Sequence, residues 1–273
     1  MPFASALVLK IVPLYMNILL GFIAGKVLNA SRETVVRIMF FIISPIVIFN
    51  GVINTRLDTS ILLLPVLTFL ISTVLCLSFY KLSKSIWKDS SKNLMAFSAG
   101  SGNTGYFGLP VALLLFNDQG EGIYIMAFLG ITLYDNSIGY YICAKGVYSP
   151  QECFWKVIKL PSLYAFLGGL FVNCTHMHIP ELFHDFMQHI KGTYTVLGMM
   201  IIGLGLAGLR NFKLDLKFIG MTFLAKFIAW PIIILVIIFL DLSVFGFFDP
   251  NVHDALMLIS IVPLAVNTVV VAS

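Results

Sequence analysis

The stretch AGSGNTGYFGLP, residues 99–110, decides the fold. Its glycines at positions 100, 102 and 105 have the G-x-G-x-x-G spacing of a dinucleotide-binding turn. That turn needs a preceding strand and opens a helix in a soluble sheet protein. Here the glycines lie about ten residues into an apolar run that starts near Lys92, a depth of about 15 Å if the run is helical and spans a membrane. We therefore interpret the match as a coincidence and expect the glycines to have another role.

The composition indicates an integral membrane protein. Of the 273 residues, 59% are hydrophobic and only 11% are charged, and the mean hydropathy is +0.97. Soluble proteins have about 25% charged residues. Since about 20 apolar residues suffice for a helix to cross a bilayer, the sequence predicts nine spans, at residues 6–28, 35–54, 60–80, 93–116, 122–144, 157–174, 193–209, 216–240 and 254–273.

The basic residues predict how the spans are oriented. They gather in every second loop, after spans 1, 3, 5 and 7, at Lys26, Arg32, Arg37, Lys81, Lys84, Lys88, Lys92, Lys145, Lys156, Lys159, Arg210, Lys213 and Lys217. Because Lys and Arg are in excess on the cytoplasmic side, we expect these loops inside and the N-terminus outside, in a cell membrane of the bacterial inner-membrane type. This bias also accounts for the net charge of +4, so no nucleic-acid partner is expected.

The opening stretch predicts an interrupted helix. Gly100, Gly102, Gly105, Gly108 and Pro110 fall within eleven residues, and together they cost too much helix propensity for a continuous rod. Inside a bilayer, irregular backbone persists only where it is buried in protein or lines a watery cavity. The interruption therefore predicts a ligand site near the middle of the membrane.

A second interruption is predicted in the last span. Pro263 precedes Asn267 and Thr268, which echo Asn103 and Thr104 of the opening stretch. Another echo joins two proline-to-glycine intervals of eight residues, Pro13 to Gly21 and Pro161 to Gly169. The spacing suggests a five-span unit that occurs twice, at 1–146 and 147–273. Because five is odd, the second copy is inverted, an arrangement typical of secondary transporters.

The segments GNTGYFGLPVALLLF (102–116) and IVPLAVNTVVVAS (261–273) resemble the auxin efflux carrier family, which includes bacterial organic-acid permeases. The resemblance covers essentially the whole chain. It implies an all-α polytopic membrane protein of two inverted five-helix repeats, with helices 4 and 9 broken and crossing, as in bile-acid symporters and sodium/proton antiporters. It also implies a scaffold of helices 1, 2, 6 and 7, a transport part of helices 3–5 and 8–10, and a homodimer through the scaffold. The chain stops at Ser273, inside the ninth span, so we expect a fragment or truncated product that lacks the tenth helix.

The broken helices predict an anion site. Half-helices that begin near Leu109 and after Pro263 would direct their electropositive N-termini at the middle of the membrane, which suits a carboxylate. The candidate substrate-binding residues are Asn103, Thr104, Gly105, Pro110, Pro263, Asn267 and Thr268. For the Asn and Thr side chains, local capping of the broken helices is the alternative.

Two charged residues within the spans are candidates for ion coupling. A charge at the centre of a span is costly and typically functional. Because the chain resembles sodium/proton antiporters, Asp135 is expected to bind H⁺, or Na⁺ together with Asn136. Lys226 is its expected partner. A static buried ion pair, or a Lys226 that reaches back to the interface, are the alternatives.

These features favour a secondary carrier that moves a mono- or dicarboxylate by alternating access, coupled to H⁺ or Na⁺. An auxin-like aromatic acid is the alternative substrate, and a channel is the alternative mechanism. No enzyme is expected, because Asp135 and Lys226 are the only charged candidates for catalysis deep within the spans, and the spans lack HExxH and GxSxG. Four histidines near an interfacial helix expected at 180–191 are interpreted as solvated, so neither a metal nor a cofactor is predicted.

Overall fold

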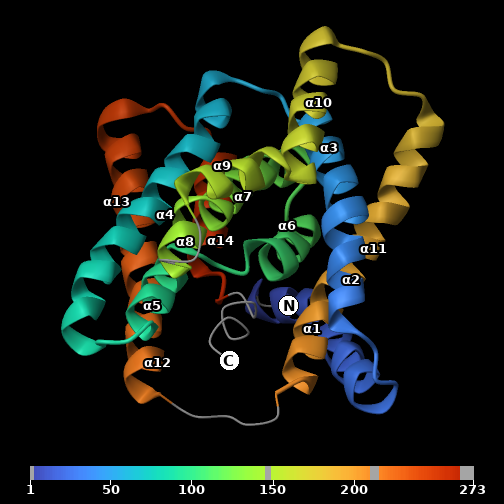
Figure 1. The fold of residues 1–273 in the computed structure, drawn as a ribbon. Coiled ribbons are helices and arrows are strands. Elements are labelled where there is room, and N and C mark those ends of the chain that lie inside the picture. Colours follow the sequence, from blue (N-terminus) through green and yellow to red (C-terminus); the bar gives the residue numbers. More distant parts are fainter. Residues whose placement is uncertain (1–2, 145–148, 210–214, 265–273) are drawn as a thin grey trace. The chain divides into compact units, whose positions relative to one another are not determined.

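The computed structural model describes residues 3–144, 149–209 and 215–264. The described residues form α-helices and four π-helical turns, and none of them forms a strand (Figure 1). The chain divides into two compact units. Unit 1 comprises Met1–Thr55, Gly105–Gly122 and Tyr164–Phe212, and unit 2 comprises Arg56–Thr104, Ile123–Leu163 and Lys213–Ser273.

Unit 1 contains two long helices, one in its first segment and one in its third. Its elements are α1 (Phe3–Val27), α2 (Arg32–Ile38), the π-turn η1 (Met39–Ile43), α3 (Ser44–Ile53), most of η2 (Thr104–Gly108), α6 (Leu109–Leu115), the first turn of α7 (Asp118–Asn136), most of α10 (Pro161–Thr175) and α11 (Glu181–Ala207).

Unit 2 holds the remaining elements. They are α4 (Thr59–Ile86), α5 (Ser91–Gly100), the rest of α7, α8 (Ile138–Cys143), α9 (Pro150–Ile158), α12 (Leu216–Phe223), η3 (Leu224–Ala229), α13 (Trp230–Leu240), η4 (Asp241–Phe245) and α14 (Pro250–Ile261).

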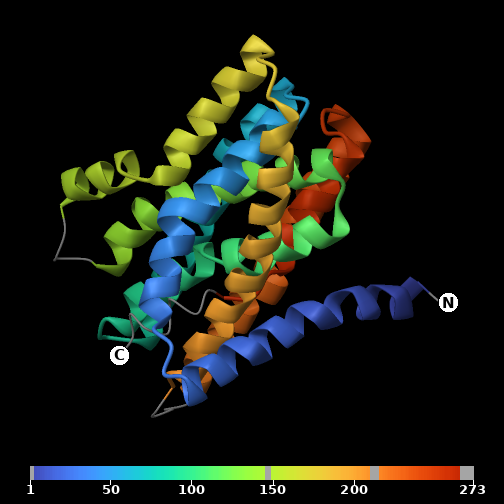
Figure 2. The same cartoon turned by 90° about the vertical axis from the view of Figure 1, so that its right-hand side faces the viewer.

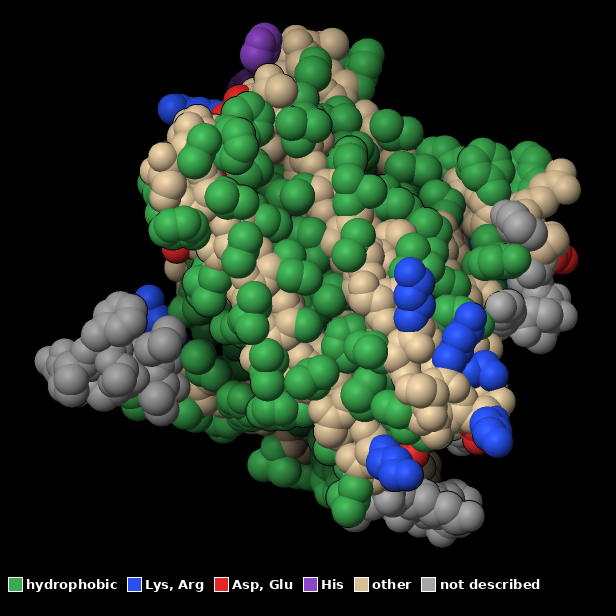
Figure 3. Space-filling model, turned by 90° about the vertical axis from the view of Figure 1, so that its left-hand side faces the viewer, with side chains coloured by type: hydrophobic (Ala, Val, Ile, Leu, Met, Phe, Trp, Pro, Cys, Tyr) green, Lys and Arg blue, Asp and Glu red, His purple; other side chains and the backbone are tan. Residues whose placement is uncertain are grey.

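Several of these helices identify a multi-pass membrane protein. Five described segments are long and apolar enough to cross a bilayer, at Leu9–Val27, Arg32–Ile53, Thr59–Ile86, Glu181–Ala207 and Leu216–Phe245. A sixth is obtained if α9 and α10, which are bent by 50° at their junction, form one span. These six correspond to predicted spans 1, 2, 3, 7, 8 and 6. Figure 3 shows one face covered mainly by hydrophobic side chains, with Lys and Arg gathered toward one end.

The other three predicted spans are not continuous apolar helices in the part of the chain that the structure describes. Span 93–116 is split between α5 and η2. Span 122–144 is divided at Ser137, between α7 and α8, and the last span leaves α14 at Ile261 and continues beyond the described residues. Glycine, proline and charged residues account for all three, because each interrupts a helix or lowers its hydropathy.

The prediction of a separate interfacial helix at 180–191 is wrong. Residues from Glu181 to Ala207 form one continuous helix, α11. A charged residue at its centre, Lys191, misled the prediction, because a paired lysine does not have to end a span.

Within unit 1, α1 and α11 pack with their backbones in contact (Figure 2). A Cβ on Gly21 would collide with the Met200 carbonyl, and one on Gly203 would collide with the Ile18 carbonyl. Small residues allow such close approach between membrane helices. A Cβ on Gly25 would lie 2.6 Å from Ala207 Cβ, so both helices advance between the contact of Gly21 with Met200 and that of Gly25 with Ala207. The helices α1 and α11 therefore run in the same direction, as the predicted orientation requires of spans 1 and 7.

Contacts between loops also agree with the predicted sides of the membrane. Trp87 Nε1 donates to Asp215 Oδ2 at 3.2 Å, and both residues belong to loops predicted inside. Asn173 Nδ2 donates to the carbonyls of Val52 and Thr55, each at 2.8 Å, and these three residues lie at ends predicted outside. Neither contact joins loops from opposite predicted sides.

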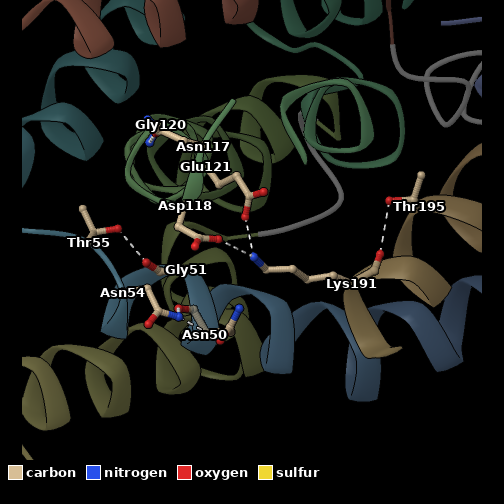
Figure 4. A network of polar contacts seen from close by, with 10 residues as sticks. All are labelled: Asn50, Gly51, Asn54, Thr55, Asn117, Asp118, Gly120, Glu121, Lys191 and Thr195. Atoms are coloured by element: carbon tan, nitrogen blue, oxygen red, sulfur yellow. Dashed lines mark hydrogen bonds and ion pairs between the residues drawn. The ribbon is translucent and has the colours of Figure 1, made fainter. Parts of the chain in front are cut away.

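A buried ionic cluster joins α7 to α11 in unit 1 (Figure 4). Lys191 Nζ lies 2.6 Å from Glu121 Oε2 and 3.2 Å from Asp118 Oδ1. The Lys191 and Glu121 side chains are only 10% and 9% exposed. Glu121 lies just before predicted span 122–144, where burial raises the pKa of its carboxyl and the hydrogen bond from Lys191 opposes that rise.

The end of α3 lies against the start of α7. The Cα of Gly122 faces Thr55, and a Cβ there would collide with the Thr55 hydroxyl and come within 2.6 Å of the Gly51 carbonyl oxygen. That hydroxyl donates to the same carbonyl at 2.6 Å (Figure 4). Only a glycine at 122 permits this approach.

We expect Lys191→Met to lower the free energy of unfolding by about 3 to 5 kcal/mol, because it leaves the Glu121 carboxylate buried without its partner. Denaturant titration of the purified protein in detergent micelles measures this change.

The matched control is Arg37→Met, which removes a cation from the Arg37–Glu33 pair, whose side chains are 71% and 74% exposed. An exposed pair contributes about 1 kcal/mol or less. Equal losses in the two variants would contradict a structural role for the buried cluster.

Candidate functional site

The helix of the opening stretch is interrupted at residues 101–103. Helix α5 ends at Gly100, and Ser101 is extended, with φ −94° and ψ 165°. The helix resumes at Thr104, in η2, and continues through α6. It therefore starts again five residues before Leu109, where the sequence analysis placed it. Pro110 is the second residue of α6 and therefore lies inside the resumed helix, from which it removes one backbone donor.

In the last span, α14 ends at Ile261, and Val262 after it is extended with φ −64° and ψ 140°. The interruption after α5 and the end of α14 touch each other within unit 2. The backbone N–H of Asn103 donates to the carbonyl oxygen of Pro263 at 2.8 Å. Asn267 and Thr268 lie outside the described residues.

Two buried aromatic side chains donate to carbonyls in the last turn of α5. Trp230 Nε1 donates to the Ala99 carbonyl at 2.8 Å, and the Tyr134 hydroxyl donates to the Phe97 carbonyl at 3.1 Å. The Phe97 carbonyl also accepts from the Ser101 N–H at 3.1 Å, so Tyr134 adds a second donor there. The Ala99 carbonyl is among the last of the helix, which have no partner in the helix itself and find none in lipid. The Trp230 indole therefore supplies the hydrogen bond that water supplies at the end of a surface helix.

Sequence reasoning missed Trp230. The available signal was a tryptophan in the interior of a span, away from the interfaces where tryptophan usually lies. A buried indole N–H needs an acceptor, and only a helix end or a polar side chain supplies one at that depth. The tertiary structure was needed to identify the end of α5 as that acceptor.

Lys226 is buried at the interruption. It lies in the π-turn η3 and is 1% exposed, so it does not reach back to the interface. Its Nζ lies over the Trp230 ring, 4.8 Å from the centroid. A Cβ on Gly102 would come within 2.9 Å of the same Nζ, which places the ammonium beside the irregular backbone.

Asp135 lies in the same unit, and its Oδ1 is buried with no hydrogen-bond partner. The Ser101 hydroxyl and the Lys226 ammonium are near enough to act on this carboxylate electrostatically. Among the described residues, however, no carboxylate lies within 4.0 Å of Lys226 Nζ. The two side chains are therefore neighbours and not a closed ion pair.

The structure brings together only part of the predicted site. Asn103, Thr104 and Pro263 share unit 2 with Asp135 and Lys226. The Thr104 carbonyl accepts a hydrogen bond from the Tyr124 hydroxyl at 3.0 Å. The role of these residues as ligands stays a prediction.

Three other predicted residues have local partners of their own. The amide of Asn136 donates to the Thr132 carbonyl of its own helix at 2.9 Å. Gly105 and Pro110 belong to unit 1. There the Gly105 carbonyl accepts from the Tyr194 hydroxyl at 3.1 Å, and the Pro110 ring faces Gly198 of α11.

Two glycine substitutions are expected to have different effects. A Cβ on Gly100 would collide with the backbone carbonyl of Ser72, which cannot move aside, so Gly100→Ala should destabilise the protein by about 1 to 3 kcal/mol or more. A Cβ on Gly102 would lie 2.9 Å from Lys226 Nζ and 3.2 Å from Val262 Cγ2, which are side-chain atoms and can shift, so Gly102→Ala should destabilise the protein less than Gly100→Ala and displace the ammonium.

Thermal unfolding of the two purified variants in the same detergent measures this difference. A large loss of stability in Gly102→Ala, or none in Gly100→Ala, would contradict the described packing.

Comparison with known proteins adds no identification to this geometry. No model of a protein family matches the chain, and no curated protein matches it. The resemblance to the auxin efflux carrier family therefore stays a prediction from the sequence.

Proposed function

We propose that the protein is a secondary carrier that moves a small organic anion, a mono- or dicarboxylate of malate-like or malonate-like size, by alternating access. One observation carries the proposal. The interruption after α5 contacts the segment beyond the end of α14 through Asn103 and Pro263, and a buried lysine lies beside the interruption. Interrupted segments of this kind typically line the substrate sites of secondary transporters.

The buried lysine favours an anion as the cargo. An ammonium removed from water is costly unless an acceptor compensates it. The Trp230 ring gives Lys226 a cation–π contact, but an aromatic face does not replace the acceptor that three N–H donors require. With no described carboxylate within ion-pair distance, a substrate carboxylate is a suitable partner.

Asp135 supplies a way to couple the anion to H⁺ or Na⁺. The positive charge of Lys226 disfavours a cation on the Asp135 carboxylate. A bound anion would offset that positive charge and so increase the affinity of Asp135 for H⁺ or Na⁺. Linkage makes the effect reciprocal: the cation on Asp135 would strengthen binding of the anion. The expected coupling is therefore cotransport.

The division of the chain supports the scaffold and transport parts that the family resemblance implies. Unit 1 holds predicted spans 1, 2 and 7 and most of 6, whereas unit 2 holds spans 3, 5 and 8 and the described part of 9. The second half of span 4, from Gly105, belongs to unit 1 and departs from that scheme. The inverted repeats and the homodimer through scaffold helices remain part of the proposal.

The proposal is tested by uptake of labelled malate and malonate into proteoliposomes. We expect saturable uptake that counterflow stimulates, which a channel does not give. Lys226→Gln should reduce uptake by at least about 30-fold, because it removes the partner of a buried charge. Indole-3-acetate in the same assay tests the alternative, an aromatic acid.

The matched control is Lys84→Gln, since Lys84 also lies over an aromatic ring, that of Tyr80, at 4.6 Å from its centroid. Lys84 is exposed on α4, and its loss should leave uptake within about twofold of wild type. Equal uptake by the Lys226→Gln variant and the wild type would reject Lys226 as a substrate ligand.

The coupling role has its own prediction. Asp135→Asn keeps the shape of the side chain and removes its charge. We expect residual uptake to lose its dependence on the pH and Na⁺ gradients. Uptake with an unchanged dependence on both gradients would show that another group carries the coupling ion.

A further inference from the structure

One carboxylate organises the turn between α13 and α14 in unit 2 (Figure 1). Asp241, the first residue of η4, is 3% exposed. Its Oδ1 atom accepts from the Phe247 N–H at 2.8 Å, and its Oδ2 atom accepts from the Phe248 N–H at 3.2 Å. The Asp241 carbonyl accepts from the Gly246 N–H at 2.7 Å. Gly246 has a left-handed φ of 55°, which glycine adopts without strain.

The same carboxylate contacts a histidine of α14. Asp241 Oδ2 lies 2.9 Å from His253 Nε2, and the two side chains are 4% and 13% exposed. The Phe248 ring meets the imidazole edge to face, with 6.4 Å between the ring centroids. The other histidines among the described residues, at positions 176, 178, 184 and 189, are exposed. A change in the charge of His253 therefore acts directly on the turn.

Asp241 is the main charged partner of His253. Helix α14 packs against α13, which has no ionisable residue, and against η3, which carries Lys226. Lys226 lies beside Gly102 and Val262, and Val262 is nine residues after His253, about 13 Å further along. The ionisable residues nearest in sequence to His253 are the exposed carboxylates of residues 249 and 254, whose influence water screens.

We propose that Asp241 and His253 form a pH-dependent latch that closes the turn between α13 and α14. When the imidazole is protonated, the contact is a buried ion pair. When it is neutral, only a hydrogen bond to the carboxylate remains. Histidine side chains typically exchange this proton between about pH 5 and 8, and the loop is predicted outside, where the medium sets the pH. The latch is therefore strong in an acidic medium and weakens as the pH rises.

The latch is connected to the interruption after α5. Helix α14 begins at Pro250, directly after the turn, and ends at Ile261. Two residues later, the Pro263 carbonyl accepts from the Asn103 N–H. A change at the turn thus reaches the interruption along a single rigid helix. The inference depends on these contacts and not on the proposed transport function.

Hydrogen exchange of the full chain in detergent micelles, read by mass spectrometry, tests the latch. The peptide that covers residues 242–253 contains the two amides that Asp241 holds. Its exchange is compared at about pH 5.5 and about pH 8, on either side of the range in which histidine exchanges its proton, with exchange times scaled for the intrinsic effect of pH on amides. We expect opening of the turn to increase on the order of tenfold at the higher pH, because an ion pair is stronger than the hydrogen bond that remains.

Two substitutions remove the latch from opposite sides. His253→Gln keeps a hydrogen-bond donor and removes the exchangeable charge, whereas Asp241→Asn keeps an acceptor for the Phe247 N–H and removes the negative charge. Each should reduce the ratio of opening between the two pH values to about twofold or less. The matched control, His184→Gln, removes an exposed histidine that is also predicted outside and should keep the ratio of the wild type.

Three outcomes would overturn the proposal. They are a wild-type ratio of about twofold or less, a wild-type ratio that persists in either folded variant, and a ratio that the His184→Gln control loses to the same extent. The last outcome would attribute the effect to histidines in general. Thermal unfolding at the lower pH verifies that each variant is folded. No step of this test uses a transported substrate, so a failed uptake assay and a failed exchange assay remain distinct results.

Discussion

A backbone group that a helix interruption frees inside a membrane must find a partner within the protein, and the centre of unit 2 is organised around this requirement. The Asn103 N–H at the break after α5 is satisfied by the Pro263 carbonyl beyond the end of α14. The Trp230 indole satisfies the Ala99 carbonyl at the end of α5, and the Tyr134 hydroxyl adds a second donor to the Phe97 carbonyl. The same indole ring lies under the Lys226 ammonium. One tryptophan therefore stabilises the interruption and orients the charge beside it.

The cost of burying Lys226 and the Oδ1 atom of Asp135 is the main argument that this region has a function. A protein that needed only stability would place apolar side chains there, since well-packed apolar groups are often as stable as a buried ionic pair. Here the two charges are close enough to influence each other and remain outside ion-pair distance. That arrangement leaves both groups able to accept further partners, whereas the buried Lys191 cluster of unit 1 is closed by two carboxylates.

Sequence reasoning predicted the first interruption because it depends on local chemistry. Glycine and proline disfavour a helix wherever they occur, so residues 100–110 identified the break after α5, and Pro263 lies just beyond the end of α14. It did not predict that the helix resumes at Thr104, nor that α11 continues through Lys191. Both outcomes depend on partners from distant segments, such as Tyr124, which binds the Thr104 carbonyl, and Glu121, which neutralises Lys191. The periodicity of the sequence does not say which helix faces meet in the fold, so it cannot predict these pairs.

The close approach of Gly122 to Thr55 fixes how α7 begins within unit 1. Because Gly122 has no side chain, the Thr55 hydroxyl can lie directly against it and still donate to the Gly51 carbonyl. A methyl group at position 122 would compete with that hydroxyl for the same space, so it would either push the start of α7 away from the end of α3 or leave the hydroxyl without its acceptor.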